Sequence, residues 1–227
     1  MILTNNYLGK LAKNQLKDLA EFVVRENFKH HSKNNFPTNY TTDVNAIYDE
    51  ELNFYDNSEV YITRNQGGTI TSAIRVLKWN YIDVLPLQKI FGINPLLAIN
   101  TPDVKDIYHI GRFAVSKDIH DINLFKKLLV CVAKPICEQK GNMAFAECDR
   151  KLLRILNLLG VKTMKIGEPV NYLGSETIPI AMNYDGVIDF YNKNKHLITQ
   201  FLAEKSTTTY KELLNINIDN RFIVIKA

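Results

Sequence analysis

The sequence predicts an α/β fold in which helices cover a mixed β-sheet. Three observations carry this prediction. Apolar residues recur at helical spacing at the start of the chain, two alternating apolar runs flank the turn Gly67-Gly68, and strand-like and helix-like segments alternate after residue 107. A layered architecture buries the apolar stripe of each such helix against a sheet.

A helix followed by a loop is expected at the N-terminus. Apolar residues lie at helical spacing with charged residues between them. These apolar residues are Leu8, Leu11, Leu16, Leu19, Phe22 and Val23. We expect the helix to end near His31. The segment 32–45 is rich in Asn, Thr and Ser and contains Pro37, so it predicts a loop.

A β-hairpin is expected next along the chain. Its first strand, Glu59–Arg64, alternates Val60 and Ile62 with polar residues, and its second strand, Thr69–Lys78, follows the glycine turn. A proline-containing stretch follows the hairpin and contains one short helix around Leu87–Phe91. The hairpin therefore supplies two neighbouring antiparallel strands to the sheet.

Strands and helices alternate in the second half of the chain. The first long helix there begins at an Asp121 or Asn123 cap, stops at Gly141, and should be kinked at Pro135. Asp149 and Gly160 cap and terminate the next helix. In order, the expected elements are strand 107–115, helix 123–139, strand 143–147, helix 150–159, strands 161–166 and 177–182, helix 189–204 and a terminal strand within 217–226.

No break in composition divides the chain into independent domains. We expect residues 1–183 to form one domain. Residues 184–227 are expected to be a C-terminal extension, a helix plus a terminal strand, packed on that same domain.

Composition limits the function classes. The net charge of +4, from 28 basic and 24 acidic residues, is too small to indicate nucleic acid binding. Three cysteines without zinc-ligand spacing indicate reduced thiols in a cytoplasmic protein and no metal site. The N-terminus does not resemble a signal peptide, and no apolar run approaches the ~20 residues of a membrane span.

Charge is unevenly distributed along the chain. Residues 34–62 contain six acidic residues and no Lys or Arg, whereas residues 126–165 contain nine basic and three acidic residues. Two interpretations remain open: solvated surface, or one side that attracts cations and another that attracts anions.

Six short segments resemble a known family. They are Arg25 with Phe28, Asn53-Phe54-Tyr55-Asp56, Ala73-Ile74-Arg75-Val76-Leu77, Leu85–Phe91, His109-Ile110-Gly111-Arg112-Phe113-Ala114-Val115, and Gly167-Glu168-Pro169 with Tyr172 and Gly174. Together they resemble the GNAT superfamily of acyltransferases and, within it, the N-acyl homoserine lactone synthases and N-acyl amino acid synthases. His109 stands where that family has a glutamate, and Asn53 where it has its first aspartate.

The resemblance implies a fold and a donor site. The implied fold is GNAT-like, with a mixed, mostly antiparallel central sheet, flanking helices and a V-shaped splay between two middle strands. The donor's pantetheine arm would lie along that splay, against Phe113, Ala114, Val115 and Phe145. A bulge at Gly111 would open the strand and bring His109 and Arg112 to one side, whereas close packing without a bulge is the alternative.

The donor is expected to be an acyl-carrier-protein or coenzyme A thioester. GNAT enzymes bind the donor pyrophosphate at a glycine-rich loop that opens a helix. The corresponding segment here, 116–123, contains no glycine and two aspartates, which favours an acyl carrier protein as the partner. Basic residues after this loop, Lys126 and Lys127 among them, could contact an acidic carrier, or they could simply be solvated.

Catalytic roles follow from the chemistry of acyl transfer. His109 is a candidate base because imidazole titrates near neutral pH, although a structural role is the alternative. Arg75 and Arg112 could hold an acceptor carboxylate, or could form structural ion pairs with Asp56 and Glu59. Asp56 itself could receive the amine.

Substrate contacts are expected from further residues. The resemblance places Arg25, Phe28 and Phe91 at the substrate. An apolar tunnel for the acyl chain would be lined by Phe91, Phe113, Phe145, Leu152 and Leu156, with ordinary core packing as the alternative.

The expected function is an N-acyltransferase, similar to the autoinducer synthases, that acylates the amine of a small amino-acid-like acceptor. Two alternatives remain open. One is a catalytically inactive GNAT-like module that binds acyl thioesters, and the other is a small-molecule acetyltransferase that uses acetyl-coenzyme A.

Overall fold

A computed structural model describes residues 7–31, 39–99, 103–172 and 175–199. The first half of the chain contains β1 (Tyr7–Lys10), the 3-10 turn η1 (Lys13–Gln15), α1 (Leu16–His31), α2 (Tyr40–Phe54), η2 (Tyr55–Asn57), β2 (Ser58–Arg64), β3 (Ile70–Lys78), α3 (Pro86–Phe91) and α4 (Pro95–Ala98). The second half contains β4 (Ile107–Val115), α5 (Ile122–Glu138), β5 (Met143–Asp149), α6 (Arg150–Leu158), β6 (Met164–Lys165), β7 (Val170–Tyr172), β8 (Ser175–Asn183), α7 (Tyr184–Asn194) and η3 (Lys195–Ile198).

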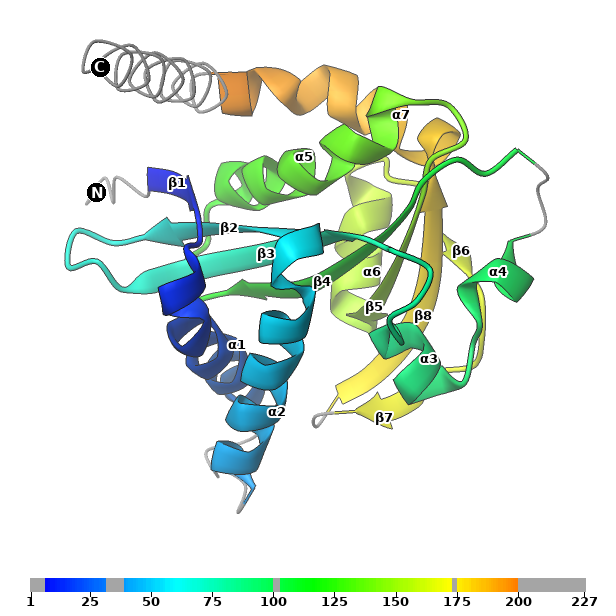
Figure 1. Ribbon diagram of the computed structural model, residues 1–227. Helices are drawn as coiled ribbons and strands as arrows, with labels where there is room; N and C mark the ends of the chain where they lie inside the picture. Colours follow the sequence, from blue (N-terminus) through cyan, green and yellow to red (C-terminus); the bar gives the residue numbers. More distant parts are fainter. Residues whose placement is uncertain (1–6, 32–38, 100–102, 173–174, 200–227) are drawn as a thin grey trace, which may run out of the picture.

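One mixed sheet organises the molecule (Figure 1). Its strand order is β1-β2-β3-β4-β5-β8-β6, with β7 paired to β8. All of these pairs are antiparallel except β4 with β5, which is parallel. The parallel pair therefore lies in the middle of the sheet, where α5 provides the crossover between its two strands.

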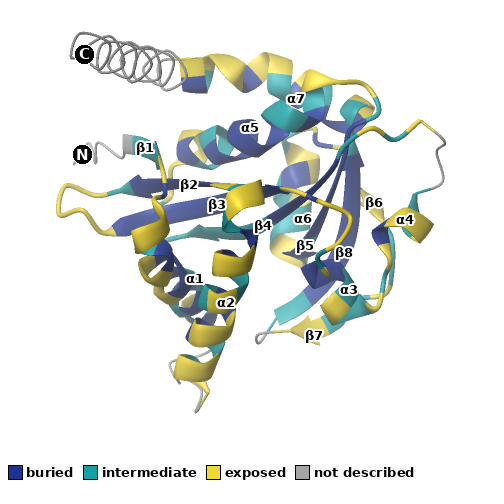
Figure 2. Ribbon diagram, viewed as in Figure 1, coloured by how far each residue is buried: buried dark blue, intermediate teal, exposed yellow. Residues whose placement is uncertain are grey.

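Helices cover both faces of the sheet. On one face Ile74 and Ile110 pack in a core with residues of α5, α6 and α7. On the other face Ile62 packs with α1, and Phe145 packs with α3. Figure 1 shows α1 beside α2 on one side and α5 beside α7 on the other, and Figure 2 shows the strands between them buried.

The expected hairpin, the strand 107–115 and the helices that follow it are confirmed. β2 and β3 pair around the glycine turn, and β4 has the expected bounds. Asp121 caps α5 by accepting a hydrogen bond from the Asn123 backbone N–H, and Asp149 caps α6 in the same way from Leu152. α5 continues through Pro135 to Glu138.

Three expectations about the elements are wrong. The first described element is β1, because residues 7–10 pair with β2 at the sheet edge, so the expected N-terminal helix begins only at Leu16, although it ends at His31 as expected. Residues 40–54 form the helix α2, where a loop was expected up to residue 45 and nothing was assigned up to residue 58. The expected strand 161–166 is reduced to β6, and β7 was not anticipated.

The C-terminal helix begins earlier than expected. α7 starts at Tyr184, where the Asn183 side chain accepts a hydrogen bond from the Gly186 N–H, and it packs on α5 through Val187 and Phe190. The expected end of this helix at residue 204 and the terminal strand 217–226 lie outside the described residues. The division into residues 1–183 and 184–227 remains a prediction.

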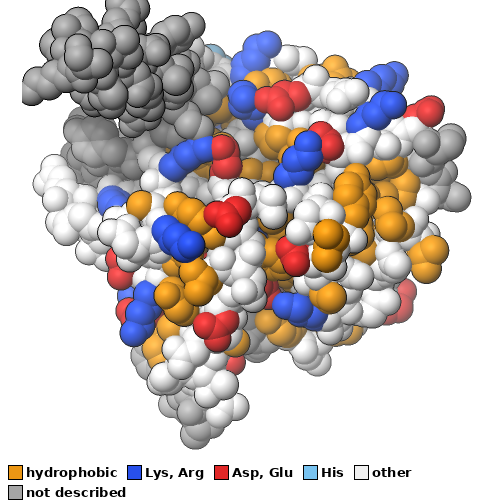
Figure 3. Space-filling model, viewed as in Figure 1, with side chains coloured by type: hydrophobic (Ala, Val, Ile, Leu, Met, Phe, Trp, Pro, Cys, Tyr) orange, Lys and Arg blue, Asp and Glu red, His pale blue; other side chains and the backbone are white. Residues whose placement is uncertain are grey.

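The described surface fits the mild net charge. On the face drawn in Figure 3, basic and acidic side chains are interspersed, with hydrophobic side chains between them. No helix in the described part of the chain is both long and apolar enough to cross a membrane.

Candidate active site

Pairing between the two middle strands ends halfway along them. β4 and β5 are paired from Ile107 and Met143 up to Ile110 and Ala146. Beyond that point β4 continues beside β3, and β5 continues beside β8. Beyond the last β4–β5 pair, each of these two strands therefore remains paired only with its outer neighbour, β4 with β3 and β5 with β8.

A pocket of about 1010 Å³ opens at this position. Its walls include Ile110, Ala146 and Cys148, which belong to the core on the α5–α7 face, and also His109 and Glu147. Because neighbouring residues of a strand point to opposite faces, the pocket has walls on both sides of the sheet. It therefore passes through the sheet where the pairing of β4 and β5 ends.

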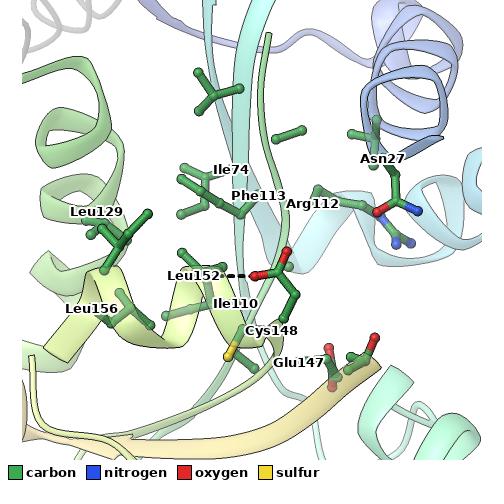
Figure 4. Close-up of a pocket in the computed structure, with 18 of the residues that line it drawn as sticks. Asn27, Ile74, Ile110, Arg112, Phe113, Leu129, Glu147, Cys148, Leu152 and Leu156 are labelled. Atoms are coloured by element: carbon green, nitrogen blue, oxygen red, sulfur yellow. Dashed lines mark hydrogen bonds between the residues drawn. The ribbon is translucent and has the colours of Figure 1, made fainter. Parts of the chain in front are cut away.

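The α5–α7 side of the pocket is apolar. In Figure 4 the side chains of Ile74, Phe113, Leu129, Leu152 and Leu156 gather on one side of β4. The Phe113 ring meets the Phe125 ring of α5 edge-on, with the centroids 4.7 Å apart. The remaining apolar walls come from α5, β8 and α7 and include Val132, Ala133, Ile136, Ile180, Met182, Val187 and Phe190.

A β-bulge sets the other side of the pocket. Ala73 of β3 pairs with Ala114 and Arg75 with Gly111, so β4 contains one extra residue between these pairs. Arg112 within the bulge has φ +56°, a left-handed conformation that a non-glycine residue adopts at some cost. A bulge next to Gly111 was expected and is present, and Figure 4 shows Arg112 extending away from the apolar side chains.

The bulge joins Arg112 to a buried ion-pair network. Glu51 of α2 accepts hydrogen bonds from Arg75 and from Arg112 Nε, the latter at 2.7 Å. Glu50 accepts from Arg112 Nη2 at 2.6 Å. The side chains of Arg75 and Glu51 are fully buried, and those of Arg112 and Glu50 are 12% and 17% exposed. Arg75 also stacks over the Phe54 ring at 5.2 Å.

His109 extends this network to Glu147. Its Nδ1 lies 3.0 Å from Arg75 Nη2, and its Nε2 lies 3.0 and 2.9 Å from the two carboxylate oxygens of Glu147. Arginine only donates hydrogen bonds, so His109 Nδ1 must accept. The ring proton therefore resides on Nε2, which donates to Glu147.

Charge pairing shifts the pKa values of Glu50 and Arg112. Burial raises the pKa of Glu50, but Arg112, followed by Arg75 and Lys89, outweighs burial and leaves that pKa below its ordinary value. For Arg112, burial lowers the pKa, but Glu51 and Glu50 outweigh burial and raise it above its ordinary value. Both groups therefore stay charged at neutral pH.

The loop between β4 and α5 lines one end of the pocket. The backbone N–H of Lys117 donates to Glu26 Oε2 at 3.2 Å, and the Asp121 carboxylate accepts from the Asn123 N–H at 2.8 Å. Glu26 is 1% exposed. Carboxylates of the protein therefore already accept hydrogen bonds from backbone N–H groups in the region where an anion would bind at a helix N-terminus.

The structure brings part of the expected site together. His109, Arg112, Phe113, Ala114 and Val115 line the pocket, as do Leu152 and Leu156. Arg75 lies behind His109 and contacts it without lining the pocket. The expectation that a bulge brings His109 and Arg112 to one side is confirmed, because both contact the Arg75–Glu51 pair.

Other expected site residues lie away from the pocket. Asp56 is exposed in η2, and the acids that pair with the two arginines are Glu50 and Glu51 rather than Asp56 and Glu59. Glu59 instead pairs with Lys10. Asp56 lies in η2, two residues after α2 ends, so it does not share the inward face of α2 on which Glu51 lies.

The expected aromatic and basic contacts are also displaced. Phe145 is fully buried on the opposite face, in a cluster that Phe91 packs against, and Phe28 is buried between α1 and α2. The Arg25 side chain lies over the Phe22 ring. Lys126 and Lys127 are half-buried on α5, where Phe125 and Leu129 face the pocket instead.

Sequence reasoning missed Glu50, Glu51 and Glu147. A helical pattern was present, since the buried residues of α2 are Val44, Ile47, Glu51 and Phe54, at helical spacing. A glutamate within an otherwise apolar stripe hid that pattern. Glu147 follows the apolar run 143–146, and its alternation with Ala146 offered no separate signal.

Comparison with known proteins places the fold. No family profile matches the sequence, and no curated protein matches it. Among solved structures, FeeM, an N-acyl amino acid synthase from uncultured soil microbes, superposes with a TM-score of 0.58 at 14% identity, covering 85% of this chain and 98% of FeeM. An acetyltransferase of the GNAT family from Staphylococcus aureus Mu50 gives 0.52 at 12% identity, covering 79% and 99%.

The fold is GNAT-like. BjaI, a CoA-dependent acyl-homoserine lactone synthase, is a further neighbour, with a TM-score of 0.55 at 12% identity, covering 84% of this chain and 90% of BjaI. The expected GNAT-like mixed sheet with flanking helices is therefore confirmed. At this identity the likeness concerns the fold, so the chemistry must be argued from the pocket of this GNAT-like chain.

Proposed function

We propose that this protein is an N-acyltransferase that moves an acyl group from a pantetheine thioester to the amine of a small acceptor. One observation carries the proposal: a single pocket passes through the sheet where β4–β5 pairing ends, apolar on one face and charged on the other. We interpret the end of this pairing as the expected V-shaped splay. A thioester in this gap would have its acyl chain on the apolar side and its carbonyl near the charged side.

The apolar side fits an acyl chain. Its walls come from α5, α6, β8 and α7, and few of them carry a polar atom. A chain buried there gains about 0.8 kcal/mol for each CH₂ removed from water. The Cys148 thiol, which lines this region, does not compete as a nucleophile, because burial raises its pKa to about 12.

The charged side fits an amine. Glu147 lines the pocket beside His109, and Glu50 and Arg112 lie on the same side. Carboxylates attract an ammonium group and can remove its proton, which makes the nitrogen nucleophilic. The neighbours named as N-acyl amino acid synthase and acyl-homoserine lactone synthase support acylation of a small amine as the reaction class.

The loop between β4 and α5 indicates which type of thioester donor fits the pocket. Glu26 and Asp121 hold backbone N–H groups there, so a coenzyme A pyrophosphate would meet carboxylates instead of free donors. We therefore favour a pantetheine presented by an acyl carrier protein, although BjaI is described as CoA-dependent. The acyl thioester is a substrate in either case.

A thiol-release assay tests the proposal. Purified protein is incubated with acyl-pantetheine, acyl-coenzyme A and acyl-carrier-protein thioesters and a panel of amines, and free thiol and amide product are measured. We expect amide formation that A146F abolishes by filling the gap, because Ala146 is the last residue of β5 that pairs with β4 and it lines the pocket. The control L158F changes an exposed residue of α6 and should retain activity.

Two results would contradict an enzymatic role. A thioester that raises the melting temperature but is never consumed would indicate a binding module without turnover. The absence of both binding and thiol release would remove the acyl-thioester site altogether. A third result would leave the enzymatic role intact: faster transfer from acetyl thioesters than from longer acyl thioesters would favour the alternative function of a small-molecule acetyltransferase.

A further inference from the structure

Glu147 lies at the point where the sheet opens. It is the residue directly after Ala146, the last residue of β5 that pairs with β4. Its side chain is 10% exposed and lines the pocket, whereas its hydrogen-bond partner His109 is 1% exposed. The carboxylate therefore faces the gap with the imidazole behind it.

Both nitrogens of His109 are already engaged. Nδ1 accepts from Arg75, and Nε2 donates its proton to Glu147. His109 therefore has no lone pair directed at the pocket with which to take up a proton. Arg75 is itself fixed by Glu51 on α2, so the orientation of His109 is set by two fully buried groups.

Glu147 differs from the other carboxylates of the cluster. Glu50 is held by Arg112 and lies within ion-pair distance of Arg75 and Lys89, which makes it a poor proton acceptor. Glu51 is fully buried between two guanidinium groups and does not line the pocket. Among the described residues, Glu147 makes its ion-pair-distance contact with His109 alone and has no such contact with an arginine or a lysine.

We propose that Glu147 accepts the proton of the acceptor amine, and that His109, held by Arg75, is the residue that positions it. This inference rests on the proposed acyltransferase function. An acceptor that arrives as an ammonium first loses one proton through Glu147 to solvent. The amine nitrogen then attacks the thioester carbonyl carbon, the new C–N bond forms, and a second nitrogen proton passes to a Glu147 oxygen. The C–S bond then breaks, and the leaving thiolate takes that proton, so the products are an amide and a free thiol and Glu147 returns to its carboxylate form.

The local hydrogen bonds suit this cycle. His109 Nε2–H lies within hydrogen-bond distance of both carboxylate oxygens, so it can continue to donate to one oxygen while the other carries the proton. The donation also fixes the plane of the carboxylate, as a positioned base requires. A general base of this kind contributes about 10²- to 10⁴-fold to the rate.

The test compares E147Q with the full-length wild-type protein. E176Q is the matched control, because Glu176 lies on the neighbouring strand β8, pairs with Arg150 at the surface and does not line the pocket. Acyl-pantetheine binding is followed by the shift in melting temperature, and amide formation is followed from pH 5.5 to 9.5. We expect E147Q to bind acyl-pantetheine like the wild type and to lose about 100-fold or more in kcat/KM.

The pH profile separates catalysis from structure. In E147Q the residual rate should keep rising with pH, because only amine that has lost its proton in solution reacts, whereas the wild type should reach its plateau at lower pH. If the wild type transfers the acyl group and E147Q is equally active, or the two pH profiles are parallel, the role of Glu147 is overturned. The proposed acyltransferase function would then still stand. An inactive wild type that also fails with every amine would overturn the proposed function and the base role with it.

Discussion

At the scale of residues, the site depends on charges buried in a fixed arrangement. Glu51 lies between the guanidinium groups of Arg75 and Arg112, and both Glu51 and Arg75 are fully buried. Such groups stabilise a protein only while each keeps its partner, because an unpaired buried charge costs several kcal/mol. The network therefore couples the stability of α2 to the geometry of β4.

Neutralising Glu51 should destabilise the protein strongly. We expect E51Q to lower the free energy of unfolding by about 3–5 kcal/mol, because it leaves two buried guanidinium groups facing an uncharged amide. Urea denaturation at pH 7 measures the change. The control E138Q removes an exposed carboxylate that pairs with Lys134 on α5 and should cost about 1 kcal/mol or less. Equal effects of the two variants would show that the Glu51 pairing is not a structural requirement.

Glu50 should make stability depend on pH. Its pKa is lower in the folded protein than its ordinary value, so its ionised form stabilises the fold above that ordinary value and the contribution is lost as pH falls through the folded value. We expect the difference in unfolding free energy between wild type and E50Q to be largest at neutral pH and to shrink below about pH 4. Urea denaturation at a series of pH values measures it, and a difference that stays constant would contradict the prediction.

At the scale of elements, β4 and β5 decide where the pocket lies. The bulge in β4 places Arg112 with His109 on one face and Phe113 on the other, while β5 places Glu147 and Cys148 on opposite faces. Helices α5, α6 and α7 then close the apolar side. Under the proposed function, the packing of these helices would set the length of acyl chain that fits.

Filling the apolar side should shorten the preferred acyl chain. Ala133 of α5 is buried and lines the pocket. We expect A133F to reduce kcat/KM for long-chain thioesters about tenfold or more relative to short-chain ones, because the ring occupies the space of several methylenes. L158F, which adds a ring on the exposed face of α6, should keep the wild-type preference. A uniform loss for all chain lengths would contradict a chain-length role for this region.

At the scale of the whole molecule, the pocket lining differs in chemistry from one end to the other. The end between α1 and the β4–α5 loop contains Glu26, His30, Lys117 and Asp121, and the His30 ring is 3.0 Å from the Val115 carbonyl oxygen. The charged end near α2 and α3 contains Glu50 and Lys89. Under the proposed function, a donor at one end and an acceptor at the other would meet at Glu147.

The nucleotide of coenzyme A should add little to binding. We expect acyl-pantetheine and acyl-coenzyme A to be used with kcat/KM values within about threefold, because Glu26 and Asp121 already hold backbone N–H groups of the loop. Steady-state kinetics with both donors measures the ratio, and D121N should improve coenzyme A use by removing one negative charge. A preference of more than tenfold for acyl-coenzyme A in the wild type would show that the loop binds the pyrophosphate.

Much of the fold could be predicted from local patterns. Alternation of apolar and polar residues, turn residues and capping residues each act over a few positions of the chain. They predicted the hairpin around Gly67-Gly68, the strand 107–115 and the caps Asp121 and Asp149. Helix α2 was not predicted, because its inward face contains the charged residue Glu51. That residue can be buried there only because it pairs with Arg75, a partner that the local sequence does not reveal.

The sequence by itself determined the layered architecture and brought His109, Arg112 and Phe113 together on one strand, since strand alternation and a bulge are local properties. Only the tertiary structure decided which carboxylates meet the arginines and which group faces the pocket. Glu51 and Glu147 lie 24 and 38 residues from Arg75 and His109, their respective partners. Burial of a charge is stable only when such distant partners converge, and that convergence is a property of the packed molecule.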